Sequence, residues 1–306
     1  MSFWNLTIKI VFLSQTATQI LGNISLIFYY LVLYYRKCKL KPTDLILMHL
    51  MAANALIILS AGVPQTMAVW GFKQLLTEFG YNFIVYVQRS ARSVSIGTTC
   101  LLSVFQAVTI SPRKSCWKDH KGKAEKYTGC CIFIIWVLYL LINFIFFVYI
   151  FTNINTKNVT RKRYFEYCST VEHDDVNDAL YAVLVVCPEV FLSGLIVWCS
   201  GSMIVLLLRH KQLAQHIRST HNSSRTSPES RATHNILSLV SIFLCFYTLS
   251  SFLRGCIALL PKHNWWLVNI TPVISLCFPY FGPFVLMNHY SVMPSLSLFW
   301  IRNNPS

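Results

Sequence analysis

The sequence predicts an all-α membrane protein, a bundle of seven transmembrane helices with its N-terminus outside the cell. The chain of 306 residues is 55% hydrophobic and only 12% charged, about half the charged fraction of roughly 25% found in soluble domains. Its apolar residues form long blocks of roughly 20 residues or more, the length that crosses a hydrocarbon core about 30 Å thick. Basic residues gather in the short connections between these blocks.

The apolar blocks predict a single membrane domain that covers residues 1–306. The expected spans are 8–35, 44–70, 81–110, 128–151, 177–208, 235–260 and 265–289. The count of seven includes two blocks that charged residues interrupt, 81–110 and 177–208. The remaining segments are then a short extracellular N-terminus (1–7), a second extracellular loop (152–176), a third cytoplasmic loop (209–234) and a cytoplasmic tail (290–306).

Charge asymmetry sets the expected direction of the chain. The connections and tail on one side of the membrane carry sixteen Lys and Arg residues, and those on the other side carry seven. Because cytoplasmic loops are enriched in Lys and Arg, the side with sixteen is assigned to the cytoplasm. An odd number of crossings then leaves the N-terminus outside. The glycosylation sequons at Asn5 and Asn158 both fall on this outer side.

The spans contain a group of polar residues that is costly to place in lipid. Arg89 and Arg92 are three residues apart, so they share one face of the third span, beside Gln88. Glu189 in the fifth span lies at comparable depth, and Arg254 approaches from the outer part of the sixth span. Intramembrane charge usually faces the bundle interior or a water-filled cavity. The group therefore predicts a ligand pocket in the outer half of the bundle.

Two alternatives to the pocket stay open on these residues. Glu189 can pair with one arginine and lock the third span to the fifth, and Arg254 can extend to the outer interface. One carboxylate cannot neutralise two arginines, and the surplus positive charge favours a pocket that accepts polar or anionic ligand atoms.

Other polar positions in the spans predict helix packing. Gln15, Gln19 and Asn23 recur every four residues and form one stripe on the first span, which indicates hydrogen bonds to a neighbouring helix. The third span is rich in Ser, Thr and Gly between 93 and 103, which favours close approach of its neighbours. His49 and Asn54 are expected to be interior polar groups.

Several function classes are disfavoured. The net charge of +15 is accounted for by membrane orientation, so nucleic-acid binding is not expected. The cysteines show no metal-ligand spacing, and neither a metal site nor a cofactor is expected. Catalytic motifs such as GxSxG and HExxH are absent from the sequence, so it does not predict an enzyme. No internal repeat of the kind found in many transporters is visible, and the intramembrane charges lie towards the outside rather than at the midplane.

Long runs of the sequence resemble vomeronasal type-1 (pheromone) receptors, a family of G-protein-coupled receptors. The resemblance covers essentially the whole chain. It rests on runs that include KPTDLIL at 41–47, SVSIGTTCLLSVFQA at 93–107, SPESRAT at 227–233 and FYTLSS at 246–251. Bitter-taste type-2 receptors are the nearest alternative among receptors, and the run at 93–107 argues against them.

The resemblance implies a fold and a function. A receptor of this family is expected to sit in the plasma membrane, to bind a small pheromone-like or volatile ligand, and to signal through a heterotrimeric G protein of the inhibitory class. Basic residues of the cytoplasmic segments are then candidates to face the G protein. These candidates are Arg113, Lys114, Arg209, Lys211 and Arg231.

One departure from the family pattern concerns a disulfide. Relatives carry a cysteine at the outer start of the third span, where this chain has Tyr81. The second extracellular loop keeps the other half of the pair, Cys168. The disulfide that would tie this loop to the third span is therefore in doubt. A second departure is Gln88, where relatives commonly have histidine, and a change of ligand preference is expected from it.

The absence of a cysteine at position 81 leads to a prediction about Cys168. Cys168 should react with a membrane-impermeant thiol reagent on intact cells, because the position of its expected partner holds no thiol. Labelling is compared with that of a Cys168→Ser variant at equal surface expression. Equal labelling of the two proteins would show that Cys168 is paired elsewhere.

Overall fold

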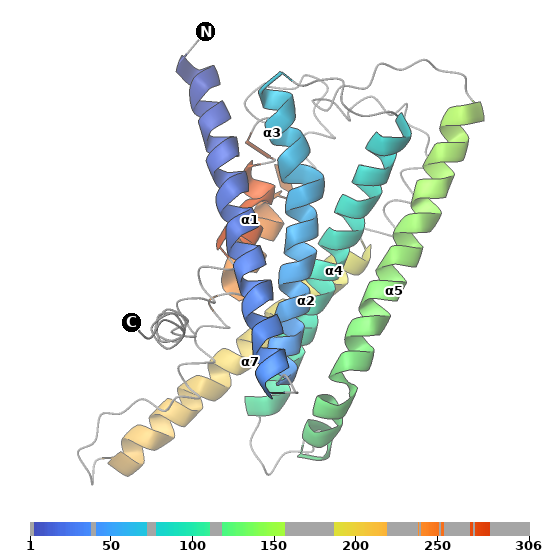
Figure 1. Ribbon diagram of the computed structural model, residues 1–306. Helices are drawn as coiled ribbons and strands as arrows, with labels where there is room; N and C mark the ends of the chain where they lie inside the picture. Colours follow the sequence, from blue (N-terminus) through green and yellow to red (C-terminus); the bar gives the residue numbers. More distant parts are fainter. Residues whose placement is uncertain are drawn as a thin grey trace, which may run out of the picture.

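The computed structural model describes residues 3–37, 41–71, 78–110, 118–156, 187–218, 238, 240–250, 252–253, 270–271 and 273–281. These residues are almost entirely helical and form a bundle of long helices (Figure 1). The helices are α1 (Phe3–Lys37), α2 (Pro42–Ile57), the π-helix η1 (Ile58–Gly62), α3 (Val63–Val69), α4 (Glu78–Ile110), α5 (Lys118–Thr156) and α7 (Cys187–Arg218). Helical residues at 240–250 and 273–281 complete the described bundle.

Consecutive helices run in opposite directions. Figure 1 shows α1 descending from the N-terminus, α2 and α3 returning, and α4, α5 and α7 continuing the alternation. The start of α1, the start of α4 and the end of α5 thus lie at one end of the bundle, and the end of α1 and the start of α2 lie at the other. We call these the N-terminal end and the opposite end.

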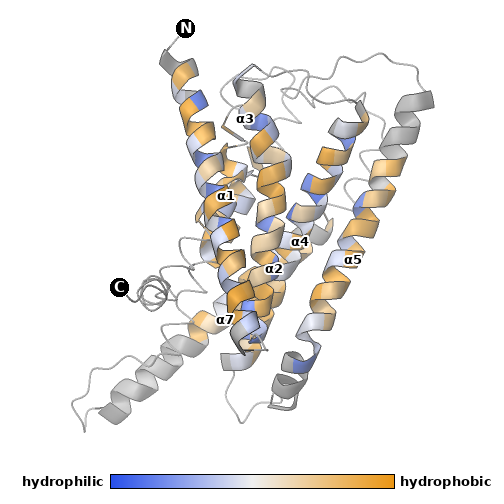
Figure 2. Ribbon diagram, viewed as in Figure 1, coloured by the Kyte–Doolittle hydropathy of each residue, from blue (hydrophilic) through white to orange (hydrophobic). Residues whose placement is uncertain are grey.

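The helices have the length and surface of membrane spans. Among the described residues, Lys9–Tyr35, Pro42–Met67 and Lys126–Ile145 are each long and apolar enough to cross a bilayer, and Val190–Val205 and Val240–Ser250 are shorter apolar helices. Large apolar side chains remain exposed along them, for example Phe28 at 63% and Trp198 at 75%, and Figure 2 shows that apolar residues predominate along these helices. Such surface suits contact with lipid.

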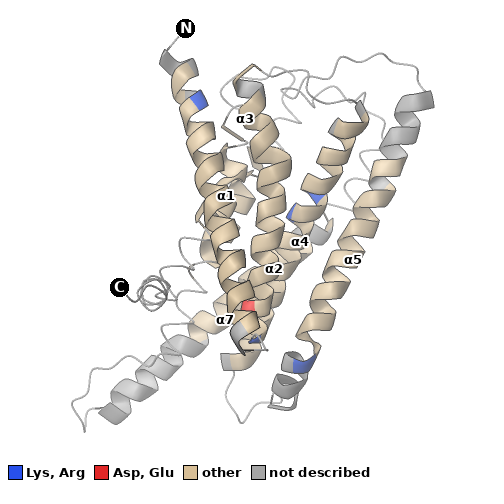
Figure 3. Cartoon of the chain, viewed as in Figure 1, with Lys and Arg blue, Asp and Glu red and all other residues tan. Residues whose placement is uncertain are grey.

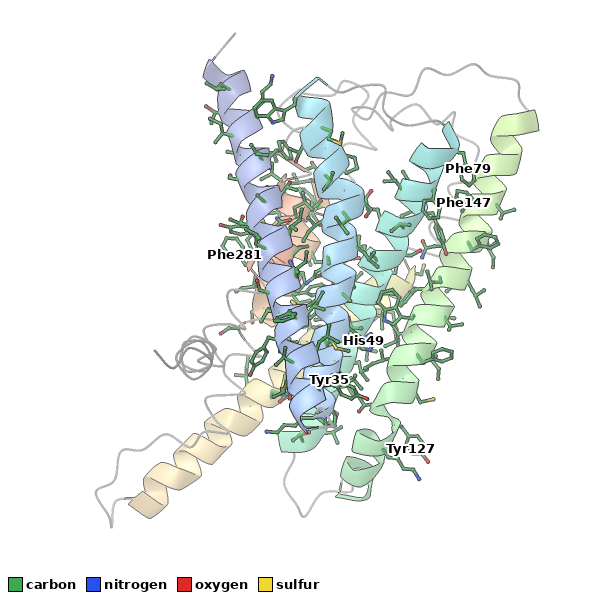
Figure 4. The ribbon with its side chains drawn as sticks, in the orientation of Figure 1. Tyr35, His49, Phe79, Tyr127, Phe147 and Phe281 are labelled. Atoms are coloured by element: carbon green, nitrogen blue, oxygen red, sulfur yellow. The ribbon has the colours of Figure 1, made fainter. Side chains whose placement is uncertain are left out.

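Helix α4 is the centre of the bundle, packing against α2, α5, α7 and η1. Its small residues from Ser93 to Ser103 are buried. A Cβ on Gly97 would lie 3.0 Å from Ile135 Cγ2 and 3.1 Å from Tyr139 Cε2 of α5, closer than ordinary contact. The packing role expected of this face is confirmed. Near the N-terminal end the same two helices meet through Phe79 and Phe147, whose rings are 6.4 Å apart (Figure 4).

The polar stripe of α1 binds the backbone of the helix at 273–281. The side-chain amides of Gln15, Gln19 and Asn23 donate hydrogen bonds to the carbonyl oxygens of Val273, Leu276 and Pro279, at 3.1, 2.8 and 3.0 Å. The prediction of interhelical hydrogen bonding is confirmed.

The sequence explains why the carbonyl of Pro279 accepts one of these bonds. A proline at 283 provides no N–H for the carbonyl of Pro279, four residues earlier. Asn23 supplies the missing donor. In lipid no water can supply this donor, so the bond holds this helix against α1.

The second span is not a uniform α-helix. Lys41 in extended conformation and Pro42 in the first turn start α2, and the π-helix η1 interrupts the span just before Pro64. A π-helical turn adds a residue and rotates the side chains that follow it. The rotation brings Thr66 within 2.9 Å of Thr16 Oγ1 on α1, between buried hydroxyl groups. Asn54, below this turn, is fully buried and accepts a hydrogen bond from Ser95 of α4 at 3.1 Å.

The α1 stripe generates a stability prediction. Asn23→Leu removes the donor to Pro279 and should cost about 1 kcal/mol, the scale of interhelical hydrogen bonds in membranes. The measurement is the apparent melting temperature of the purified receptor in detergent, which should fall by a few degrees.

Thr18→Val is the matched control. Thr18 is exposed on the same helix and its hydroxyl bonds only to the carbonyls of Ser14 and Gln15 in the described structure. If both variants melt at the same temperature as the parent, the α1 stripe does not stabilise the bundle.

Candidate ligand cavity

A cavity of about 220 Å³ opens between the second, third, sixth and seventh spans. By the same measure a single water molecule needs only about 10–15 Å³, so the cavity has room for a small organic molecule. Ten of its nineteen described lining residues are apolar, and the other nine carry polar groups of the kind that orient a ligand. The polar lining residues are Ser60, Gln65, Gln88, Arg92, Ser95, Tyr247, Ser250, Thr271 and Ser275.

Helix α4 presents one edge to the cavity. Gln88, Arg92, Ser95 and Ile96 line it, and their spacing of three or four residues places them on one face of the helix. Arg92 comes fourteen residues after Glu78 in a helix of 33 residues, hence about 21 Å along a length of about 50 Å. Gln88 and Arg92 therefore lie in the half of the helix nearer the N-terminal end, and Ser95 and Ile96 lie just past its middle.

Arg92 is the only charged residue among the described lining residues. Its Nη2 donates a hydrogen bond to Ser250 Oγ at 3.0 Å, and its guanidinium lies 4.5 Å from the centre of the Tyr247 ring. Ser250 and Tyr247 are themselves buried. The electron-rich face of an aromatic ring stabilises a guanidinium that lies above it.

Aromatic side chains connect the sixth and seventh spans at the cavity wall. Phe243 stacks on Tyr247 at 5.5 Å between ring centres and meets Phe278 edge to face at 4.6 Å. Phe246 stacks on Phe281 at 5.5 Å. These rings give the cavity a rigid apolar wall beneath its polar groups.

The structure brings together only part of the predicted polar group. Gln88 and Arg92 line the cavity, and their role in binding a ligand stays a prediction. Arg89 is half-buried and is not among the lining residues, because its side chain is one position away from the Gln88–Arg92 edge of α4. Figure 3 shows these two arginines of α4 well away from both helix ends. The side chains of Glu189, in the first turn of α7, and Arg254 lie outside the described residues.

Several cavity residues escaped prediction from the sequence. Gln65, Tyr247, Ser250 and Ser275 are uncharged, and uncharged polar residues are common in helical interiors. Ser60 and Gln65 reach the wall because η1 rotates the second span between them. The available signal was the spacing of Tyr247 and Ser250, which lie three residues apart in a mostly apolar helix.

The remaining predicted sites stay predictions. Asn158, Cys168, Arg254, Arg113, Lys114 and Arg231 lie outside the described residues, and the side chains of Asn5, Tyr81, Arg209 and Lys211 are not described. The backbone of Asn5 belongs to α1 at the N-terminal end, and those of Arg209 and Lys211 belong to the last third of α7. Figure 1 places the end of α7 at the opposite end of the bundle.

Comparison with known proteins decides the family. The model of the vomeronasal organ pheromone receptor family matches residues 6–296. The chain belongs to this family. Vomeronasal type-1 receptor 4 of Homo sapiens is 45% identical over 276 residues, which cover 90% of this chain and 92% of that receptor. Vomeronasal type-1 receptor 3 of Homo sapiens is 41% identical over 299 residues, covering 97% of this chain and 96% of that receptor.

The fold comparison agrees with the family. The crystal structure of squid rhodopsin superimposes with a TM-score of 0.67 at 12% sequence identity, covering 97% of this chain and 86% of rhodopsin. The protein therefore has the seven-transmembrane fold of G-protein-coupled receptors. It is a multi-pass membrane receptor of the vomeronasal type-1 family, which is a family of receptors and not of enzymes.

Proposed function

We propose that this vomeronasal-type receptor binds a small pheromone-like molecule in the cavity between the second, third, sixth and seventh spans and signals through a heterotrimeric G protein of the inhibitory class. The main support for this ligand site is the composition of the cavity wall. Its described residues include one cation, Arg92, among apolar and hydroxyl-bearing side chains. Pockets with this composition are the usual sites for small ligands.

The wall favours a particular kind of ligand. Phe243, Phe246 and Phe278 contact an apolar body, while Arg92 attracts a negatively charged or strongly polar atom. Gln88, four residues before Arg92 on the same helix edge, adds an amide that both donates and accepts. We therefore assign the cavity to a small hydrophobic molecule with an anionic or strongly polar group.

The orientation of the bundle supports the direction of signalling. Gln88 and Arg92, the candidate ligand contacts on α4, lie in the half of that helix nearer the N-terminal end, which charge asymmetry assigns to the outside. The basic positions Arg209 and Lys211 belong to the last third of α7, whose end is on the opposite side. A ligand that binds one arrangement of the bundle better than another shifts the population towards it, and the G protein reads the change at the cytoplasmic end.

The assignment of Arg92 can be tested with a ligand panel. A G-protein reporter assay in cells measures responses to volatiles, steroids and sulfated steroids. Arg92→Gln should weaken the potency of anionic agonists about tenfold or more, because hydrogen bonds to a charged group contribute about 1.5–3 kcal/mol.

Arg89→Gln is the matched control, since Arg89 lies on the same helix but does not line the cavity. It should leave potency within about twofold of the parent at equal surface expression. An Arg92→Gln receptor with unchanged potency would place the ligand elsewhere. A larger loss from Arg89→Gln than from Arg92→Gln would move the site to the other face of α4.

A further inference from the structure

The side chain of Arg92 does more than line the cavity, because it joins two spans. It leaves α4 and contacts two residues of the helix at 240–250, Ser250 through a 3.0 Å hydrogen bond and Tyr247 through its ring face at 4.5 Å. Both partners lie on one edge of their helix, three residues apart. The described contacts thus fix the guanidinium to the sixth span by two different interactions.

The contact continues into the seventh span. Tyr247 stacks on Phe243, and Phe243 meets Phe278 edge to face at 4.6 Å. Arg92, Tyr247, Phe243 and Phe278 all line the cavity. A row of direct contacts therefore runs along the cavity wall from α4 through the sixth span to the seventh, at the level where a ligand would sit.

The partners are built to hold the guanidinium in one place. Ser250 is 1% exposed and Tyr247 is 8% exposed, so neither is solvated in the described structure. Ser250 Oγ also donates to the carbonyl oxygen of Tyr247 at 2.9 Å, which leaves its lone pairs towards Arg92. A charge-assisted hydrogen bond of this kind is stronger than one between two neutral groups.

We propose that Tyr247 and Ser250 are positioning residues for Arg92, and that this contact is a latch between α4 and the helix at 240–250 that holds the receptor in its resting arrangement. The proposal rests on the proposed function, since it gives the ligand-binding cation a second role. A polar ligand group that binds the guanidinium competes with Ser250 for the N–H donors of Arg92. Ligand binding then weakens the contact between the third and sixth spans and shifts the population.

The test uses the full-length receptor and needs no identified ligand. Ser250→Ala removes the acceptor, Ser250→Thr keeps a hydroxyl, and Thr248→Ala removes an exposed hydroxyl that bonds only within the described part of its own helix. The first readout is hydrogen exchange of the peptide covering 240–250 in receptors reconstituted in nanodiscs, because exchange reports local opening. The second is agonist-independent G-protein activation per receptor at the cell surface.

Ser250→Ala is expected to speed exchange at 240–250 and to raise basal activity about fivefold, the lower end of coupling typical between sites. Ser250→Thr should restore the parent behaviour in both readouts. Tyr247→Phe, which keeps the ring, should exchange like the parent, and Tyr247→Leu should exchange like Ser250→Ala. Exchange in Ser250→Ala equal to that in Thr248→Ala would overturn the latch.

The two readouts separate the latch from the proposed function. Faster exchange with no G-protein activation by any receptor, the parent included, supports the contact between the spans and refutes the proposed coupling. Faster exchange with basal activity unchanged from an active parent overturns the resting role of the latch. Faster exchange that Ser250→Thr fails to restore would also overturn it, since the hydroxyl would not be the acting group.

Discussion

The fold depends on the requirement that backbone carbonyls inside a membrane find hydrogen-bond donors within the protein. The helix at 273–281 creates the demand, because a proline at 283 leaves the carbonyl of Pro279 without its usual donor. Asn23 of α1 supplies that donor, and Gln15 and Gln19 add hydrogen bonds to the carbonyls of Val273 and Leu276 on the same helix. This contact brings together segments more than 250 residues apart in the sequence and places the seventh span against the first, where it can form one wall of the cavity.

Helix α4 packs against neighbouring helices and also lines the cavity. Between Ser93 and Ser103 its small residues pack closely against α2 and α5. Towards the N-terminal end, Gln88 and Arg92 project into the cavity. The tight half fixes the register of the helix, so the guanidinium of Arg92 has a defined position relative to the sixth span. A rigid support of this kind is what a cation needs if it is to bind a ligand and a neighbouring helix.

Patterns along single helices were readable from the sequence, and contacts between helices were not. The spacing of Gln15, Gln19 and Asn23 predicted an interhelical stripe, and the intramembrane position of Gln88 and Arg92 predicted a pocket. The exclusion of Arg89 from the wall could not be predicted, because two residues three positions apart share a face only approximately. The pairing of Arg92 with Ser250 also escaped, since any of several hydroxyl groups in the spans offered the same chemistry.

The sequence by itself determined the membrane setting, the receptor family and the helix faces, because hydropathy, charge placement and periodicity are local properties of the chain. Tertiary structure alone decided which carbonyls α1 satisfies, how η1 rotates the second span, and which aromatic rings and hydroxyl groups surround Arg92. These features depend on the rotation of each helix about its own axis. That rotation is set by close packing against neighbouring helices, and it fixes the partner of every polar group in the cavity wall.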